Sequence, residues 1–180
     1  MAERPVFVAK ESAPFYKTVN VSFSWNGGFS KVQKQKNITS IHREFHSLYP
    51  GKKVLEISGK SMQEYGKDLS AFSLRKYVPE AGRKIPVENI YQSAKTFRDG
   101  GPYTDLMLVS PREAKREERL KNSGPLTGFT FEGRTFPLKP SHIFYDYIYM
   151  GALLENEELS KVLLEYDAFT DIEFNPNKSI

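Results

Sequence analysis

The spacing of apolar residues in the first third of the chain changes from alternation to helical periodicity. Apolar and polar side chains alternate over residues 18–25, which predicts a strand. A basic run follows at residues 31–37. Apolar residues then recur at helical spacing over residues 39–49, and the Pro-Gly pair at 50–51 is expected to end that helix. A short strand is predicted over residues 53–58.

Glycine and proline divide the middle of the chain. Residues 59–74 are interrupted by two glycines, which predicts a loop that leads into a short helix. Pro86 is suited to the start of a helix, so the spacing predicts one over residues 87–97 that the double glycine at 100–101 closes.

The segment over residues 110–124 carries a strong helix start. Its N-cap, first helical residue and capping-box acid are Ser110, Pro111 and Glu113. Gly124 is expected to end this helix. Residues 129–138 then have the pattern of a hairpin that turns at Glu132-Gly133.

Two further helices are predicted near the end of the chain. The first covers residues 142–154 with Ser141 as its cap, and the second covers residues 156–166. The final stretch, residues 169–180, is expected to be irregular. We therefore predict a single α+β domain over residues 1–180, rich in helices, with a small antiparallel sheet.

Composition limits the class of protein. The chain has 180 residues and no cysteine, which excludes disulfides and indicates a reducing compartment, so we expect the protein in the cytoplasm. Neither a signal peptide nor an apolar run of membrane-spanning length is evident, so no membrane partner is expected. A formal charge of +4 mildly favours an anionic partner such as nucleic acid.

The predicted helix over residues 87–97 has two different faces. The residues that fall within an arc of about 80° are all apolar or small. They are Val87, Ile90, Ala94 and Phe97. Glu88, Gln92 and Lys95 lie within about 60° of one another on the adjacent face, and Tyr91 lies between the two sets. This polar line is either a solvated stripe or the wall of a cleft.

Several separate motifs resemble the NADAR superfamily. "VENIYQSAKTF" is similar to the "TxEHxFQAxKF" helix of that family, and "YGKDLSAFSL" is similar to the "YGxLSNFYP" loop that precedes it. Four other stretches, "GGPYTDL", "EAKREERLK", "FYDYIY" and "FTDIEFNP", resemble the antitoxin branch that accompanies DarT DNA ADP-ribosyltransferase toxins. The resemblance extends from about Val19 to the last residue.

The resemblance implies an enzyme that hydrolyses an N-glycosidic bond. For the antitoxin branch it implies removal of ADP-ribose from guanine in DNA, with ADP-ribosylated DNA and the cognate DarT-type toxin as partners. Two positions depart from the family. Ala71 stands where "LSNF" has asparagine. The glycine-rich end of YbiA, the riboflavin-pathway member of the superfamily, is replaced by "DIEFNPNKSI". The second departure argues against a YbiA-like substrate. The resemblance also implies that the natural chain is able to continue beyond Ile180.

Three residues are candidates for the catalytic step. Glu88 is able to transfer a proton or stabilise positive charge. Lys60 occupies the place where many family members have a lysine, and a desolvated lysine is able to attack C1 of the ribose and form an imine. Lys95 supplies a positive charge that would act on the pKa values of both groups.

Other residues are candidates for holding the substrate. Gly100 and Gly101 allow close backbone approach, while Tyr145 and Tyr149 share a helix face and are able to stack on a base. The full predicted set is Ser70, Tyr91, Gln92, Gly100, Gly101, Tyr103, Asp105, Tyr145, Asp146, Tyr149, Asp171 and Glu173. The predicted DNA contacts are Lys31, Lys34 and Lys36, whose charges suit phosphates.

No metal site or cofactor is predicted. His42 and His46 do not have the spacing of a zinc enzyme, and with His142 they are interpreted as surface or hydrogen-bonded histidines. Three functions remain open at this point. They are a guanine-specific ADP-ribose glycohydrolase acting as an antitoxin, a module that binds ADP-ribose or the toxin without chemistry, and a YbiA-like glycosidase of riboflavin intermediates.

Overall fold

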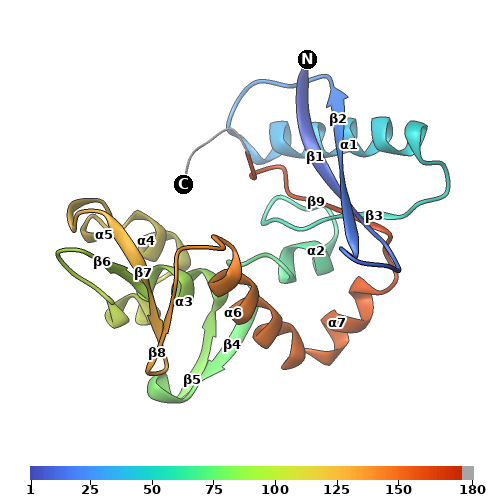
Figure 1. The fold of residues 1–180 in the computed structure, drawn as a ribbon. Coiled ribbons are helices and arrows are strands. Elements are labelled where there is room, and N and C mark those ends of the chain that lie inside the picture. The colour runs from blue at the N-terminus through green and yellow to red at the C-terminus, as the bar shows by residue number, and fades with distance from the viewer. Residues whose placement is uncertain (176–180) are drawn as a thin grey trace. The chain divides into compact units, whose positions relative to one another are not determined.

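The computed structural model describes residues 1–175 (Figure 1). Helices and three small, mostly antiparallel sheets make up the structure, which confirms the predicted α+β class. Contacts divide the chain into two compact units. Unit 1 comprises Met1–Ser70 and Glu158–Ile180, and unit 2 comprises Ala71–Glu157.

Unit 1 is built on a four-stranded sheet in the order β2-β1-β9-β3. Its strands are β1 (Ala2–Ala9), β2 (Tyr16–Phe23), β3 (Val54–Glu56) and β9 (Ala168–Thr170). The two strands predicted in this region are confirmed as β2 and β3. β9 contradicts the irregular end predicted for the chain, since it pairs antiparallel with β1 and parallel with β3. Three residues are too few to show a period, and both partners of β9 are distant in sequence.

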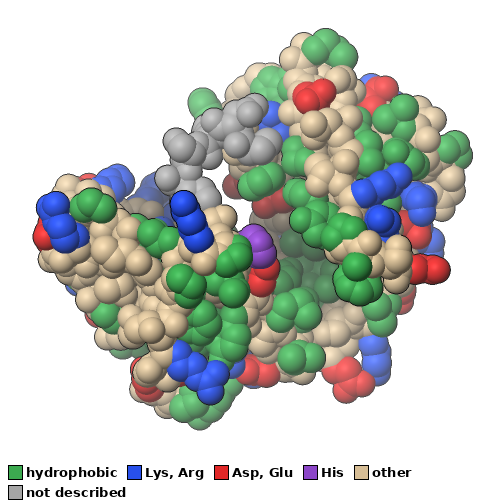
Figure 2. Space-filling view, in the orientation of Figure 1, with side chains coloured by type: hydrophobic (Ala, Val, Ile, Leu, Met, Phe, Trp, Pro, Cys, Tyr) green, Lys and Arg blue, Asp and Glu red, His purple; other side chains and the backbone are tan. Residues whose placement is uncertain are grey.

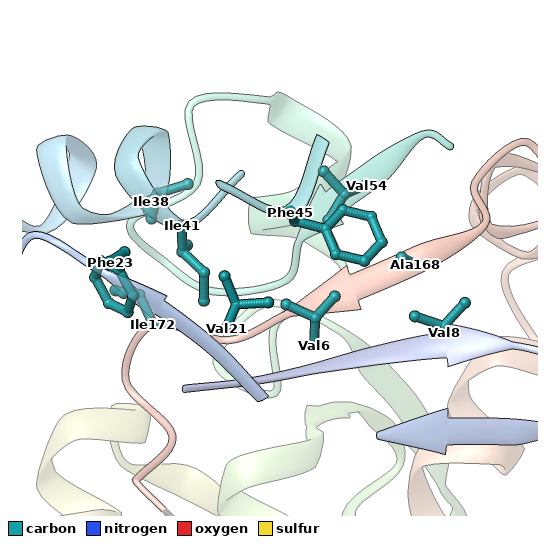
Figure 3. Close-up of a cluster of buried hydrophobic side chains, with 10 residues drawn as sticks. All are labelled: Val6, Val8, Val21, Phe23, Ile38, Ile41, Phe45, Val54, Ala168 and Ile172. Carbon is teal, nitrogen blue, oxygen red and sulfur yellow. The ribbon is translucent and has the colours of Figure 1, made fainter. Parts of the chain in front are cut away.

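Helix α1 (Lys31–Leu48) supplies the other half of the core of unit 1. The predicted helix is confirmed but begins earlier, because the basic run forms its first two turns and Ser30 caps it by accepting a 3.2 Å hydrogen bond from the Gln33 N–H. Figure 3 shows the buried side chains of α1 facing those of the sheet. From the helix these are Ile38, Ile41 and Phe45, and from β1 and β2 they are Val6, Val8, Val21 and Phe23.

The segment after β3 folds into the predicted loop and short helix. Helix α2 (Glu64–Asp68) places Gly66 against the backbone carbonyl of Glu56, where a Cβ atom would collide. This close approach explains the glycine. Helix α7 (Glu157–Leu163) confirms the last predicted helix, with Val162 buried.

Unit 2 begins with a hairpin that the sequence pattern did not predict. Strands β4 (Arg75–Val78) and β5 (Arg83–Pro86) are joined by the 3-10 turn η1 (Pro79–Ala81). Helix α3 (Val87–Ser93) follows directly, with Pro86 as its N-cap.

Helix α3 is shorter than predicted. Residues Lys95–Phe97 form strand β6, which pairs with β7 (Leu126–Phe131). The double glycine therefore does not close a helix. Gly100 instead accepts a 2.8 Å hydrogen bond from the Phe97 N–H in a tight turn, and Gly101 has a φ of 80°.

The predicted capping box is confirmed at the start of α4 (Pro111–Arg116), following the 3-10 helix η2 (Thr104–Leu108). The single helix predicted up to Gly124 is wrong. Glu117 adopts an extended backbone and its carboxylate accepts a 3.1 Å hydrogen bond from the Arg119 N–H, so a new helix, α5 (Arg119–Asn122), starts after it.

The last part of unit 2 packs one helix on a hairpin. β7 and β8 (Arg134–Phe136) turn at Glu132 and Gly133, which have φ values of 48° and 71°, as predicted. Helix α6 (Ile143–Leu154) packs Phe144 at 4.7 Å from Phe129, ring centroid to ring centroid. Its N-cap is His142 and not the predicted Ser141.

Candidate functional site

A buried carboxylate lies in the first turn of α3. Glu88 is 7% exposed, and its carboxylate accepts a 2.9 Å hydrogen bond from the side-chain amide of Gln92, one turn later. The N–H of Glu88 donates to the carbonyl of Ala71 at 2.9 Å. Among residues 1–175 no Lys, Arg or His forms an ion pair with this carboxylate. The groups that stabilise it are the Gln92 amide and the N-terminal end of α3, in whose first turn it lies.

Lys95 lies close to Glu88 although it belongs to β6 and not to the helix. Its side chain is half-buried, and its ammonium lies 5.0 Å from the centroid of the Tyr91 ring. Burial lowers the pKa of Lys95, attraction to Glu88 opposes that shift, and repulsion from Lys115 adds to it. Glu88, Gln92, Tyr91 and Lys95 thus share one neighbourhood, as the sequence predicted.

A run of tyrosines continues from this neighbourhood onto α6. The Tyr91 ring meets Tyr145 edge-on with centroids 5.7 Å apart, and Tyr145 is stacked on Tyr149 at 5.8 Å. Burial raises the pKa of Tyr91, and the nearby charge of Glu88 raises it further. We name Glu88, Tyr91, Gln92, Lys95, Tyr145 and Tyr149 the Glu88 cluster.

Two side-chain amide oxygens of α3 have no hydrogen-bond partner within residues 1–175. They are Oε1 of Gln92 and Oδ1 of Asn89, and both are buried. The Asn89 amide donates to the carbonyls of Leu106 and Val109, at 2.7 and 2.8 Å, and so ties η2 to α3. Sequence reasoning missed Asn89, because no spacing marks a buried amide between Glu88 and Ile90.

The other predicted binding residues of unit 2 have local partners. The Tyr103 hydroxyl is hydrogen-bonded to Ser123, and the Arg119 guanidinium lies 4.6 Å from the centroid of the Tyr103 ring. Arg119 also forms an ion pair with Asp105. Asp146 is exposed and lies 2.7 Å from Nδ1 of His142. These contacts give Tyr103, Asp105 and Asp146 structural roles apart from any ligand.

In unit 1, Lys60 lies in the loop between β3 and α2. Its side chain is half-buried, its N–H donates to the Ser58 hydroxyl at 3.2 Å, and its carbonyl accepts a hydrogen bond from the Gln35 amide at 3.3 Å. The loop backbone is therefore fixed on both sides of the lysine. Ser70, the last residue of this part of unit 1, is buried.

A buried polar network lies directly before that loop. Glu56 is 2% exposed and accepts hydrogen bonds from the Thr170 hydroxyl at 2.6 Å, from the Ile172 N–H at 2.8 Å and from Ser58. Burial raises the pKa of Glu56. Sequence reasoning missed Glu56, because two of its partners, Thr170 and Ile172, are more than 110 residues away in the sequence.

His42 completes this network from α1. Its Nε2 lies 2.8 Å from the Thr170 hydroxyl, and because that hydroxyl donates to Glu56, the imidazole must be the donor. Burial, followed by repulsion from His46, lowers the pKa of His42 to about 4. The network therefore holds the segment after β9, where the Asp171 carboxylate accepts a 2.9 Å hydrogen bond from the Glu173 N–H and both side chains are exposed.

The predicted DNA-contacting lysines lie on the first turns of α1. Lys31 and Lys36 are exposed, and Lys34 is half-buried with its ammonium 5.4 Å from the centroid of the Trp25 ring. On the face shown in Figure 2, Lys and Arg side chains form several separate groups with Asp and Glu among them. The charge of +4 is thus not gathered into one patch on that face.

Within the part of the chain that the structure describes, no three acidic, histidine or cysteine side chains are grouped in a way that would hold a metal ion. Over the same residues, every helix is too short or too polar to cross a membrane.

Comparison with known families gives one match that covers almost the whole chain. Residues 2–180 match the family model described as DarT1-associated NADAR antitoxin. The match includes both units and every residue of the Glu88 cluster. A comparison with curated proteins gives no match.

Proposed function

Because the chain belongs to the DarT1-associated NADAR antitoxin family, we propose that it removes ADP-ribose from guanine bases in DNA and so reverses the action of a DarT-type toxin. The NADAR family is associated with N-glycosidase-type activity. The observation that supports this activity most directly is the Glu88 carboxylate, buried without an ion pair beside a half-buried lysine. Burial lowers the pKa of that lysine, Lys95, and ionisable groups shifted by burial concentrate at reactive sites.

The chemistry assigned to Glu88 is proton transfer. Hydrolysis breaks the bond between C1 of the ribose and the guanine nitrogen, the bonding electrons leave with the base, and a water oxygen becomes attached to C1. The departing base takes up one proton, and the attacking water loses one. Glu88 accepts the proton of the water, and its charge stabilises the oxocarbenium-like transition state.

Lys95 and the tyrosines assist in this proposal. The ammonium of Lys95, held at the face of Tyr91, supplies a positive charge near the Glu88 carboxylate. Gln92 orients the carboxylate through its 2.9 Å hydrogen bond, and its unpaired Oε1 is an acceptor for a donor on the substrate. Tyr145 and Tyr149 offer aromatic surface for a base.

Lys60 is proposed as a nucleophile at C1. Its neutral amine bonds to C1 as the bond from C1 to the guanine nitrogen breaks, and one amine proton passes to the departing base. The bond from C1 to the ring oxygen then opens, the second amine proton passes to that oxygen, and an imine remains. Water adds to C1, and the bond from C1 to the lysine nitrogen breaks, which releases ADP-ribose and restores the neutral amine. The fixed loop backbone on both sides of Lys60 supports this role, since a nucleophile must be held in place. The resemblance to the family supports it as well.

The direct test is incubation of the protein with DNA that carries ADP-ribose on guanine. We expect free ADP-ribose and intact guanine in the DNA. Tight binding of the modified DNA without release would identify a binding module instead. Release of a base from riboflavin intermediates, with none from DNA, would favour the YbiA-like activity.

A further inference from the structure

An exposed aromatic side chain lies close to two cations in unit 1. Trp25 follows β2, and its indole is 37% exposed. The guanidinium of Arg4 lies 5.3 Å from the centroid of its ring, and the ammonium of Lys34 lies 5.4 Å from it. Phe23, part of the core, supports the indole at 6.1 Å between centroids. The tryptophan is thus fixed at the surface and flanked by positive charge.

A second aromatic side chain lies in the same loop. Phe29 is 96% exposed, which is a costly place for a large apolar group. The loop that carries it is anchored, because the buried Asn37 accepts a 2.7 Å hydrogen bond from the Asn26 N–H and returns one of 3.0 Å to the Asn26 carbonyl. The structure therefore presents both aromatic side chains on a held backbone.

The charges of the two cations beside Trp25 are not neutralised by ion pairs within the described residues. Within residues 1–175 neither Arg4 nor Lys34 forms an ion pair with a carboxylate, and the first turn of α1 contains no acid. A guanidinium and an ammonium next to an aromatic ring suit phosphate oxygens next to a base.

We propose that Trp25, Phe29, Arg4 and Lys34, the Trp25 surface, bind single-stranded DNA. Unstacked bases lie on the aromatic rings, and the phosphates between them meet Arg4 and Lys34. Bases of a duplex are stacked on each other and have no free face for an indole, so this surface favours single strands. The choice of DNA rests on the proposed function, in which DNA carries the modification.

The protein contains a single tryptophan, so its fluorescence reports on this surface directly. We expect unmodified single-stranded oligonucleotides to quench Trp25 and to bind more tightly than the matched duplex. Equal affinity for the duplex, or binding with no change in Trp25 fluorescence, would overturn the proposal. The use of unmodified DNA separates this test from catalysis, because such DNA carries no ADP-ribose to be released, so binding by the Trp25 surface can be observed even if the glycohydrolase proposal fails.

Two substitutions make the test specific. Trp25→Ala should weaken binding of single strands about tenfold, whereas Trp25→Phe should retain most of it, with binding followed through a label on the DNA. Phe29→Ser should also weaken binding, and its exposure makes an effect on folding small. Unchanged affinity in both Trp25→Ala and Phe29→Ser would overturn the proposal and point to a protein partner.

Salt dependence tests the role of the cations. Lys34→Gln should reduce the slope of log affinity against log salt by about one, as expected for one phosphate contact. Lys84→Gln is the matched control, since it removes the same charge from an exposed position in unit 2. Equal slopes in the wild type and Lys34→Gln would exclude Lys34 from the phosphate contacts.

Discussion

At the scale of single residues, the Glu88 carboxylate is held by one side-chain hydrogen bond, from the amide of Gln92. The sequence predicted this neighbourhood because Glu88 and Gln92 are four residues apart and both fall inside the true helix. Glu56, equally buried, was not predicted. Its partners Thr170 and Ile172 lie beside it only because β9 pairs with β3, and the spacing of residues along the chain does not predict that pairing.

Glu88→Gln is the first residue-scale prediction. Glutamine keeps the size of the side chain and an oxygen that accepts the Gln92 hydrogen bond, but it cannot take a proton. We expect release of ADP-ribose to slow by about 100- to 10,000-fold with an unchanged melting curve. Glu80→Gln, an exposed carboxylate, is the control and should keep full activity. Near wild-type turnover in Glu88→Gln would remove Glu88 from the mechanism.

Lys60 makes a prediction of a different kind, since an imine is a covalent intermediate. Borohydride added during turnover should reduce it to a stable amine, and mass spectrometry should locate the ADP-ribosyl adduct on Lys60. Lys60→Ala should form none, while Lys53→Ala, an exposed lysine of the same unit, should form it normally. An absent adduct, or one of equal yield in Lys60→Ala, would leave Glu88 to activate water directly.

At the scale of elements, periodic patterns located most helices but misplaced their ends, and of the strands they predicted β2, β3, β7 and β8 but not β1, β4, β5, β6 or β9. Val87 and Phe97 are both buried, as a helix over residues 87–97 requires, yet Phe97 belongs to a strand. The pattern cannot separate these cases, because β6 is defined by its pairing with β7, about thirty residues later. The Glu88 cluster survives the error, since Lys95 still lies beside Glu88.

The contact between α1 and β9 through His42 and Thr170 predicts a pH dependence of stability. The pKa of His42 is lowered to about 4, so below pH 6.5 the unfolded chain binds a proton that the folded chain does not. Stability is therefore lost as the pH falls from 6.5 towards 4, by at most about 3 kcal/mol for a shift of this size. The raised pKa of Glu56 acts in the opposite direction.

His42→Gln isolates this effect, because an amide donates to Thr170 as the imidazole does and does not titrate. Denaturant unfolding at several pH values, followed by the fluorescence of Trp25 in unit 1, should show a smaller acid loss in the variant than in the wild type. Glu56 is present in both proteins, so its contribution largely cancels. His142→Gln, at an exposed position of unit 2, should behave much as the wild type does. Parallel pH curves for His42→Gln and the wild type would contradict the assignment.

At the scale of the whole molecule, the family match covers residues 2–180, so both units belong to the family. Composition and charge alone predicted little of it, since a charge of +4 is compatible with many partners. What the sequence supplied was a set of motifs spread over both units, from the Lys60 loop to α6. The fold class could be predicted from periodicity, but the division into two units depends on contacts between the two ends of the chain.

The base to which ADP-ribose is attached is the last prediction, and it follows from the family to which the whole chain belongs. Two oligonucleotides of the same length, one modified on guanine and the other on thymine, should be processed at different rates, with the guanine-linked ADP-ribose released faster. Different bases place different groups beside the glycosidic nitrogen. A buried acceptor such as Oε1 of Gln92 stabilises the complex with a base that donates a hydrogen bond to it, and the complex with a base that leaves it unpaired is less stable. Release should be measured as initial rates at low substrate concentration, where the ratio of the two rates equals the ratio of the two kcat/KM values.

An ADP-ribosylated protein provides the third comparison and should be processed least. Equal rates for guanine and thymine would contradict guanine specificity while leaving the glycohydrolase activity in place, and Glu88→Gln should abolish whichever release is observed.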